Sequence, residues 1–286
     1  LRVAAQLVQA ADGFHLWSDT YDRTLDDVFA IQEDIAGRVV EALKITLLGN
    51  AATTLVQRST QNMEAYDAYL LGQQRLARRR SDALEEAARH FQRAIDLDPR
   101  FAQAHAGLAQ AYYQLSGYGT LTSTKALEKA TPELERALEL DPALGEAHAL
   151  SGVILEDKRD VEGAEASFRR AIELNPNYPM AFMWYALLMG VRDLDRRNEL
   201  IQKALALDPL SPVINTNIGY CLAEEGKTSE AIKQFEHVIE IDPGFVSAYQ
   251  GLAEVYGNRL DRLEKALELY RKAMELDPGN LGSRLT

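Results

Sequence analysis

The sequence predicts an all-α fold of stacked helical hairpins, preceded by a small α+β segment. Two observations support this prediction. Apolar residues recur three or four positions apart in paired segments, which is the spacing of one face of an α-helix. An acidic residue or Asn followed by Pro ends these pairs at nearly fixed intervals, at Asp98-Pro99, Asp141-Pro142, Asn175-Pro176, Asp208-Pro209, Asp242-Pro243 and Asp277-Pro278.

The distances between successive prolines are 43, 34, 33, 34 and 35 residues. A period of this length indicates repeated two-helix units, and a hydrophobic content of 47% is enough to bury a seam between them. We therefore predict twelve antiparallel helices in six hairpins over residues 63–278. The longest interval has its surplus at residues 116–122, which predicts a lengthened loop. The fourth unit should pack differently, because Arg197 replaces an expected Ala and its first helix is nearly all apolar.

The segment Gly145–Pro176 shows the repeated unit most clearly. The small pair Ser151-Gly152 stands in its first helix, and Ala164, Phe168 and Ala171 recur along its second. These residues match the Leu-Gly, Ala, Phe and Ala positions of the tetratricopeptide pattern, so residues 63–286 resemble the tetratricopeptide-repeat family. The resemblance implies a solenoid whose first helices line a concave groove for a peptide or partner segment.

Residues 1–48 predict an incomplete α+β domain. Alternating apolar residues in Leu1–Ala10 and Phe14–Tyr21 indicate a β-hairpin, and the apolar spacing from Leu25 to Leu47 indicates a helix. The stretches HLWSDTYDR and DVFAIQEDIA resemble the end of the TolB-like amino-terminal domain, which precedes tetratricopeptide arrays in bacterial cyclases and transcriptional regulators. Residues 49–62 are small and polar, which predicts a linker.

Composition argues against several classes of function. The net charge of −12 opposes direct binding to nucleic acid or to an anionic membrane. No apolar stretch reaches the length of a membrane span, and Cys221 is the single cysteine, which we expect to be a small buried residue. We expect a cytoplasmic protein. The start at Leu1 rather than Met leads us to expect a fragment of a longer chain.

Motifs for catalysis, metal binding or cofactor binding are not found. The patterns HExxH, paired Cys, Gly-x-Ser-x-Gly, Walker loop and EF-hand are absent, and Gly117-x-Gly119 lacks the rest of a phosphate loop. His105 and His148 fall at equivalent repeat positions that, by resemblance, pack within the hairpin, so we expect core residues rather than metal ligands. We expect neither an enzyme nor a cofactor. The arginines at 78–80 either grip an anionic partner or face water at a helix end, and we favour the second interpretation.

By resemblance, the groove-facing positions lie in the first helices of the second to sixth repeats. They carry Glu, Gln and Met, whereas relatives that bind acidic chaperone tails use Lys, Arg and Asn, so we expect an apolar or basic ligand segment. Met180, Met183 and Leu187 form a predicted apolar anchor, with a purely structural role as the alternative. The complete predicted set is Gln103, Gln110, Tyr113, Glu146, Val153, Glu156, Met180, Met183, Leu187, Tyr220, Glu224, Gln250 and Glu254.

These features predict a protein–protein interaction module that is the regulatory part of a larger bacterial signalling protein. One alternative is a carboxyl-terminal fragment of an adenylate or guanylate cyclase in which the solenoid is mainly a structural connector. Another is a free-standing scaffold. A two-stranded hairpin with a free edge is marginal in water, so we also predict a homodimer through residues 1–21, with a frayed monomer as the alternative.

Overall fold

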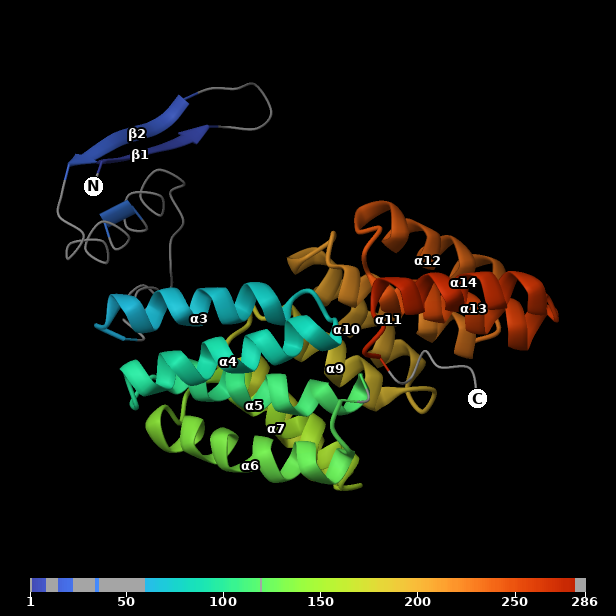
Figure 1. Cartoon of the computed structure of the whole chain (residues 1–286), viewed down its shortest axis with the longest axis horizontal. Coiled ribbons are helices and arrows are strands. Elements are labelled where there is room, and N and C mark those ends of the chain that lie inside the picture. The colour runs from blue at the N-terminus through green and yellow to red at the C-terminus, as the bar shows by residue number, and fades with distance from the viewer. Residues whose placement is uncertain (1, 9–14, 23–33, 36–59, 119, 281–286) are drawn as a thin grey trace. The chain divides into compact units, whose positions relative to one another are not determined.

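The computed structural model describes residues 2–8, 15–22, 34–35, 60–118 and 120–280, and the chain divides into two compact units, residues 1–63 and 64–286 (Figure 1). In the first unit, β1 (Arg2–Val8) pairs antiparallel with β2 (His15–Asp22), which confirms the predicted hairpin. The Tyr21 hydroxyl donates a hydrogen bond to Asp34 Oδ2 at 2.7 Å. Residues 34 and 35 are helical, and the rest of the predicted Leu25–Leu47 helix lies outside the described residues.

Twelve helices follow along the described part of the chain, in the order of the colours from α3 to α14 in Figure 1. They form six antiparallel hairpins, which confirms the predicted all-α solenoid. The hairpins are α3 (Met63–Leu76) with α4 (Ser81–Leu97), α5 (Ala102–Gly117) with α6 (Ser123–Leu140), α7 (Gly145–Asp157) with α8 (Val161–Leu174), α9 (Pro179–Met189) with α10 (Leu194–Leu207), α11 (Pro212–Glu224) with α12 (Thr228–Ile241), and α13 (Val246–Leu260) with α14 (Leu263–Leu276).

The paired Asp or Asn and Pro residues end the second helix of each unit by a local mechanism. The proline cannot continue a helix, because it lacks an N–H and disfavours the helical conformation in the residue before it. The preceding side chain then accepts a hydrogen bond from the backbone N–H two residues later, which closes an Asx turn. This bond is present at Asp98, Asp141, Asn175 and Asp242, with distances of 2.9 to 3.2 Å.

A second local feature fixes the first helix of several units. The side chain six residues after the repeat proline reaches back to that proline's carbonyl oxygen. His105 Nε2 lies 3.2 Å from Pro99 O and His148 Nε2 lies 2.9 Å from Pro142 O, while Asn215 and Tyr249 donate to Pro209 and Pro243 at 3.0 Å. The two histidines therefore pack within their hairpins as expected, where His105 is buried and His148 is half-buried.

Large side chains of the second helices fill space that glycines leave in the first helices. A Cβ atom added at Gly72 or Gly107 would lie 2.6 Å from the Phe91 ring, closer than real atoms approach. Phe235 has the same relation to Gly219 and Gly251. The Gly positions of the repeat pattern are therefore required by the fully buried phenyl rings that lie against them.

The fourth hairpin departs from this packing, as predicted. Arg197 of α10 stands where the neighbouring units have Ala, and its side chain is fully buried. Its guanidinium is paired with Glu225, and Glu224 lies 3.8 Å away. Helices α10 and α11 also touch at fewer positions than the other consecutive pairs between hairpins. The loss of contact predicted for this unit is therefore present.

The lengthened loop predicted in the second repeat is present, because residues 118–122 connect α5 to α6, whereas residues 158–160 connect α7 to α8. The two helices are longer as well: α5 has 16 residues and α6 has 18, against 13 in α7 and 14 in α8. The surplus of this repeat is therefore shared between the loop and the helices. The hydroxyl of Thr122 then caps α6 by accepting from the Lys125 N–H.

The two ends of the helical array meet. Asp277, just after α14, accepts hydrogen bonds from the Ser81 hydroxyl and from the Ser81 backbone N–H, the latter at 2.9 Å. Both residues are buried, with 2% and 5% of their surface exposed. The N-cap residue of α4, Arg80, supplies no side-chain cap, so Asp277 satisfies this helix start from the other end of the array.

Two further findings concern individual side chains and helices. Cys221 is 4% exposed, as expected for a small core residue, and burial raises the pKa of its thiol. Among the described residues, none of the helices combines the length and apolar character that crossing a bilayer requires.

Candidate binding groove

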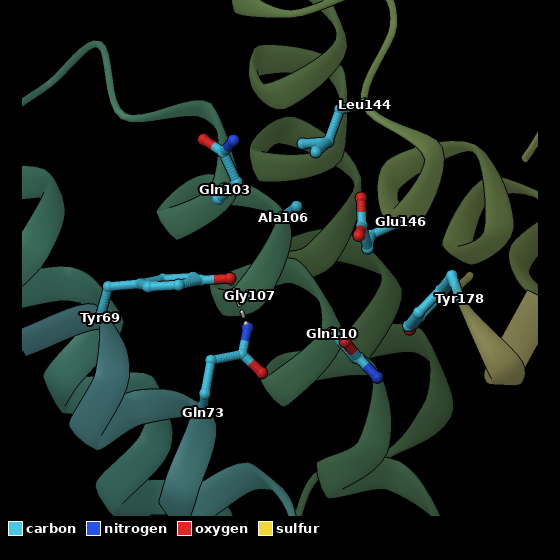
Figure 2. A pocket seen from close by; sticks show the side chains of 9 residues that line it. All are labelled: Tyr69, Gln73, Gln103, Ala106, Gly107, Gln110, Leu144, Glu146 and Tyr178. Atoms are coloured by element: carbon cyan, nitrogen blue, oxygen red, sulfur yellow. Dashed lines mark hydrogen bonds between the residues drawn. The ribbon is translucent and has the colours of Figure 1, made fainter. Parts of the chain in front are cut away.

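The inner face of the array contains two hollows that form the candidate site. The first, of about 160 Å³, is built by α3, α5 and the start of α7, with one side chain from the turn before α9. Figure 2 shows Tyr69 and Tyr178 on opposite sides of it, with Gln110 and Glu146 between them in this view. Its lining residues are Tyr69, Gln73, Gln103, Ala106, Gly107, Gln110, Leu144, Glu146 and Tyr178.

The first hollow is rich in carboxamides and phenols. Gln73 Nε2 donates to the Tyr69 hydroxyl at 3.0 Å, and Glu146 Oε1 accepts from Asn175 Nδ2 at 2.7 Å. Burial, with a smaller effect of Glu146, raises the pKa of Tyr69 to about 12, and the same two causes raise the pKa of Tyr178. Both hydroxyls therefore stay protonated at neutral pH and remain hydrogen-bond donors.

The second hollow, of about 240 Å³, joins segments that are distant in the sequence. The turn between α3 and α4 and the residue after α5 contribute to it, and α9, α11 and the start of α13 form the rest. Most of its walls are aromatic or aliphatic, and Arg79 is the cation among the described lining residues. The lining residues are Arg79, Tyr118, Trp184, Leu187, Val213, Thr216, Asn217, Tyr220, Phe245 and Ser247.

Electrostatic effects connect the two hollows through Arg79. Burial raises the pKa of Tyr118 in the second hollow and of Tyr178 in the first, and the guanidinium of Arg79 opposes both shifts. Burial in turn lowers the pKa of Arg79. Burial also raises the pKa of Tyr220, with Glu254 as the next cause. The groove therefore has a poorly solvated cation at the junction of its polar and apolar parts.

Five of the thirteen predicted groove residues line these hollows. Gln103, Gln110 and Glu146 line the first, and Leu187 and Tyr220 line the second. Each comes from a first helix of a hairpin, as the repeat pattern implied.

The predicted apolar anchor is wrong for Met183. Its side chain is fully buried and packs in a core cluster that includes Tyr185, Leu200 and Ile214, so it cannot contact a partner. Met180 is half-buried against the same cluster. Leu187, which is 36% exposed, is the member of the three that reaches the groove.

The other predicted contacts lie outside the two hollows and remain predictions. Tyr113 donates to Asp157 Oδ2 at 2.8 Å, and burial together with Asp157 raises the pKa of Glu156. Burial also raises the pKa of Glu254. The remaining residues of this group are Val153 and Gln250, which are half-buried, and Glu224, which is exposed.

Several lining residues were missed because they lie outside the repeat positions taken as groove-facing. Arg79 belongs to the turn after α3, and it is half-buried rather than directed to water as expected. Arg78 is exposed, and Arg80 pairs with Asp82 at 2.9 Å, so the favoured interpretation fits these two neighbours. The three consecutive arginines at 78–80 were the feature of the sequence that could have indicated Arg79 as a binding residue. The other missed residues are Tyr69, Gln73, Ala106, Gly107, Tyr118, Leu144, Tyr178, Trp184, Val213, Thr216, Asn217, Phe245 and Ser247.

Family profiles match most of the helical part of the chain. A profile described as "TPR repeat" matches residues 77–116, and profiles described as "Tetratricopeptide repeat" match residues 127–179, 213–245 and 246–280. Together these segments cover more than half of the chain. Residues 180–212, which include nearly all of the fourth hairpin, fall between the matches.

Individual relatives match only parts of their own length. "Putative adenylate cyclase 3" of Rhizobium meliloti (strain 1021) is 33% identical over 109 residues, which are 38% of this chain and 19% of that protein. "Small glutamine-rich tetratricopeptide repeat-containing protein 2" of Mycosarcoma maydis is 33% identical over 92 residues, 32% of this chain and 26% of that protein. The chain thus spans about a fifth to a quarter of these two relatives.

Among solved structures, the human IFIT1 dimer with m7Gppp-AAAA resembles this chain with a TM-score of 0.60. The sequence identity is 20%, and the likeness covers 86% of this chain and 55% of that one. At this identity the likeness concerns the fold alone.

Proposed function

Because the chain belongs to the tetratricopeptide-repeat family, whose solenoids present concave surfaces for partners, we propose that its groove binds an extended peptide segment. The observation that carries this proposal is the pair of hollows on the inner face, one rich in carboxamides and the other walled by aromatic side chains. The chain contributes binding rather than catalysis to the protein in which it acts.

The chemistry of the first hollow suits a peptide backbone. An extended segment presents alternating N–H donors and C=O acceptors, and a carboxamide such as Gln103 or Gln110 can satisfy either kind. The protonated hydroxyls of Tyr69 and Tyr178 add donors for carbonyl oxygens. Glu146 opposes a second negative charge there, so the segment beside it is apolar or basic.

The chemistry of the second hollow suits an anchoring side chain. Trp184, Leu187 and Tyr220 offer apolar surface that a partner's aliphatic or aromatic residue buries on binding. Buried anchors of this kind carry most of the binding free energy in many interfaces. The polar hollow then sets the direction of the segment, and the apolar hollow supplies most of its affinity.

The setting that we propose is regulation within a larger bacterial signalling protein. The relative named as an adenylate cyclase and the resemblance of residues 1–48 to a TolB-like domain support this setting. The same relative supports a second candidate, in which the array mainly connects the domains of a cyclase. Peptide binding by the groove is expected for the regulatory module and not for a structural connector.

The test is capture of peptides by the purified chain. A random pool of N-acetylated and amidated dodecapeptides is passed over immobilised protein, and retained peptides are measured by mass spectrometry. Gln110→Ala should lower retention about fivefold, the effect of losing about 1 kcal/mol of binding free energy. Gln92→Ala is the matched control, since Gln92 is exposed on α4 and lines neither hollow. Absence of retention by the unaltered chain would favour the connector.

The proposal also includes a homodimer formed by the β-hairpin. The β1–β2 sheet has two strands in the described structure, and sheet edges present unpaired backbone groups that recruit further strands. Light scattering on residues 1–286 and on residues 60–286 should give a dimer mass only for the longer chain. Monomer masses for both chains would exclude the dimer.

A further inference from the structure

Arg79 is a cation for which the described structure supplies no ion-pair partner. Two nearby arginines are paired, Arg80 with Asp82 at 2.9 Å and Arg75 with Glu86 at 3.0 Å. The groups that influence Arg79 are instead two phenols, those of Tyr118 and Tyr178. Arg79 is half-buried and lines the second hollow, so a negative group that enters this hollow can pair with its guanidinium.

An independent polar group lies in the same hollow. Thr216 is 4% exposed, and its hydroxyl has no hydrogen-bond partner among the described residues. Buried hydroxyls are normally paired, because the loss of hydration is otherwise uncompensated. Thr216 lines the hollow together with Arg79 and Asn217. The hollow therefore holds a cation and an unpaired hydroxyl donor, surrounded by apolar walls.

We propose that this hollow is a receptor for a single carboxylate carried on an apolar segment of the bound peptide. The carboxylate pairs with the Arg79 guanidinium and accepts a hydrogen bond from Thr216, while the adjoining apolar side chain lies against Trp184 and Leu187. This inference rests on the proposed function and narrows it. A charge-assisted hydrogen bond to a poorly solvated guanidinium is stronger than one in water, so the carboxylate adds selectivity as well as affinity.

The surroundings admit one negative charge and oppose a second. Glu146 lines the adjacent hollow, and Asp277 is close enough to raise the pKa of Tyr118. The cavity of about 240 Å³ also has room for one such group with its neighbouring side chain. The expectation of an apolar or basic ligand is therefore refined to an apolar segment with one carboxylate, either an acidic side chain or the carboxyl end of a chain.

Three matched peptide pools test the proposal and identify the source of the carboxylate. All are N-acetylated heptapeptides with random apolar flanks around one fixed central residue. The first has Glu at the centre and an amidated end, the second has Gln and an amidated end, and the third has Gln and a free carboxyl end. The immobilised full chain should retain the first or the third about tenfold more than the second. The pool that is retained identifies the source.

Variants locate the effect. Arg79→Gln should remove the preference for a carboxylate, and Arg78→Gln, at the exposed neighbour, should leave it unchanged. Arg79→Gly provides a variant that the fold accepts, because the backbone at Arg79 has φ 49°, and glycine occupies the equivalent position at Gly226 with φ 76°. Circular dichroism of each variant monitors folding.

Thr216→Val gives a result that a purely structural role would not produce. Replacing a buried, unpaired hydroxyl with a methyl group of similar shape should raise the melting temperature. The same change should lower the preference for the carboxylate pools several-fold, because the donor is lost. A rise in stability together with a loss of selectivity therefore supports the proposal.

The outcomes separate the two proposals. Equal retention of all three pools would overturn the carboxylate receptor and leave the peptide groove in place. Retention of none would overturn both. A 5′-phosphorylated A12 oligoribonucleotide serves as a competing anion, and its binding in place of the peptides, dependent on Arg79, would also overturn the assignment.

Discussion

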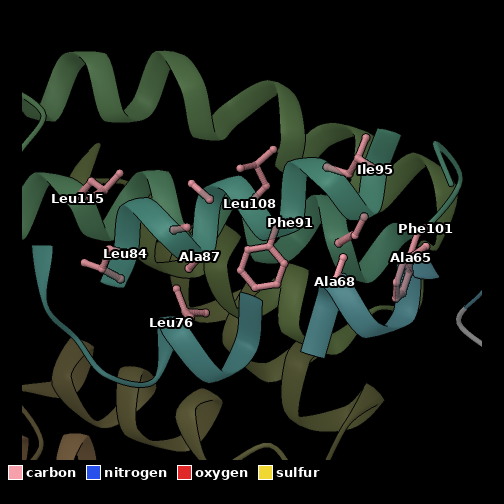
Figure 3. Packing of buried hydrophobic residues seen from close by; sticks show 14 residues of the cluster. Ala65, Ala68, Leu76, Leu84, Ala87, Phe91, Ile95, Phe101, Leu108 and Leu115 are labelled. Carbon is pink, nitrogen blue, oxygen red and sulfur yellow. The ribbon is translucent and has the colours of Figure 1, made fainter. Parts of the chain in front are cut away.

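The fourth and fifth hairpins are neighbours of nearly equal length, yet their interiors use different side chains. In the fifth, Ala231 and Phe235 of α12 lie at consecutive turns, and the phenyl ring packs against glycine. The first hairpin has the same arrangement around Phe91, which Figure 3 shows at the centre of its apolar cluster. In the fourth, Arg197 and Ile201 occupy the two positions. The fourth hairpin thus has a large Arg in place of Ala and a smaller Ile in place of Phe.

The fourth hairpin also lacks the side chain that ties the first helix to the repeat proline. Phe182 stands six residues after Pro176, and a phenyl ring cannot donate to its carbonyl as Asn215 and Tyr249 do in the next two units. Its stability depends instead on apolar burial and on a charge contact with the hairpin that follows. The repeat scaffold therefore tolerates a buried Arg where the next unit provides a carboxylate, here Glu225.

The largest effect is expected from breaking that charge contact. Glu225→Gln keeps the shape of the side chain but leaves the fully buried Arg197 without its paired carboxylate. Removing one member of a buried ion pair destabilises a protein by about 3 kcal/mol or more, and urea unfolding followed by circular dichroism measures it. Glu224→Gln is the matched control, because this partner is 61% exposed at 3.8 Å and should change stability by less than about 0.5 kcal/mol. Equal effects of the two changes would contradict the assignment.

The next largest effect is expected from the glycines of the regular hairpins. Gly219→Ala places a methyl group 2.6 Å from the Phe235 ring and should cost about 1 to 3 kcal/mol. Gly117→Ala is the control, since nothing lies within 4 Å of a Cβ atom there. A stability of Gly219→Ala equal to that of the control would show that the ring moves aside freely.

A change of opposite sign is expected at the buried cation. Arg197→Met combined with Glu225→Leu replaces both members of the ion pair by apolar side chains and should raise the free energy of unfolding by about 1 kcal/mol. The Nε and Nη1 atoms of Arg197 have no hydrogen-bond partner in the described structure, which adds to the gain. A loss above about 2 kcal/mol would instead show that the ion pair stabilises the fold.

The smallest effect is expected from adding or removing the hydrogen bond between a first helix and the carbonyl oxygen of the preceding repeat proline. Phe182→Tyr gives the fourth hairpin a hydroxyl that can reach the carbonyl of Pro176, as Tyr249 reaches Pro243. It should add about 0.5 to 1 kcal/mol, and Tyr249→Phe should remove a similar amount. Unfolding curves of both variants check the pair, and two losses of equal sign would show that the fourth hairpin cannot accommodate the tie.

The boundaries of the helical hairpins could be predicted because their causes are local. Pro and the preceding Asp or Asn form a turn from adjacent residues, as at Asp141 and Asp242, and the Gly and Phe positions complement each other within one unit. The loop at residues 116–122 could be predicted from its Gly, Ser and Thr residues, and the helices α5 and α6 end and begin at Gly117 and Ser123.

The groove was only partly predictable because its walls depend on how the array curves. Helix α9 is apolar on nearly every side, so its pattern cannot distinguish the buried Met183 from the exposed Leu187. Arg79 and Tyr118 lie beside turns, and only the curvature of the array brings them opposite α11. Contacts between residues more than a hundred positions apart leave no signal in a repeat period.

The contact between Ser81 and Asp277 changes how this array should unfold. Most solenoids have only nearest-neighbour contacts, so their two ends fray independently. Here the residues joined are 196 positions apart, and melting the last turn after α14 also removes the cap from α4. The two termini of the array therefore lose structure together. Since closing so long a loop is entropically costly, this contact should form late in folding and give the array a higher contact order than its local hairpins alone would produce.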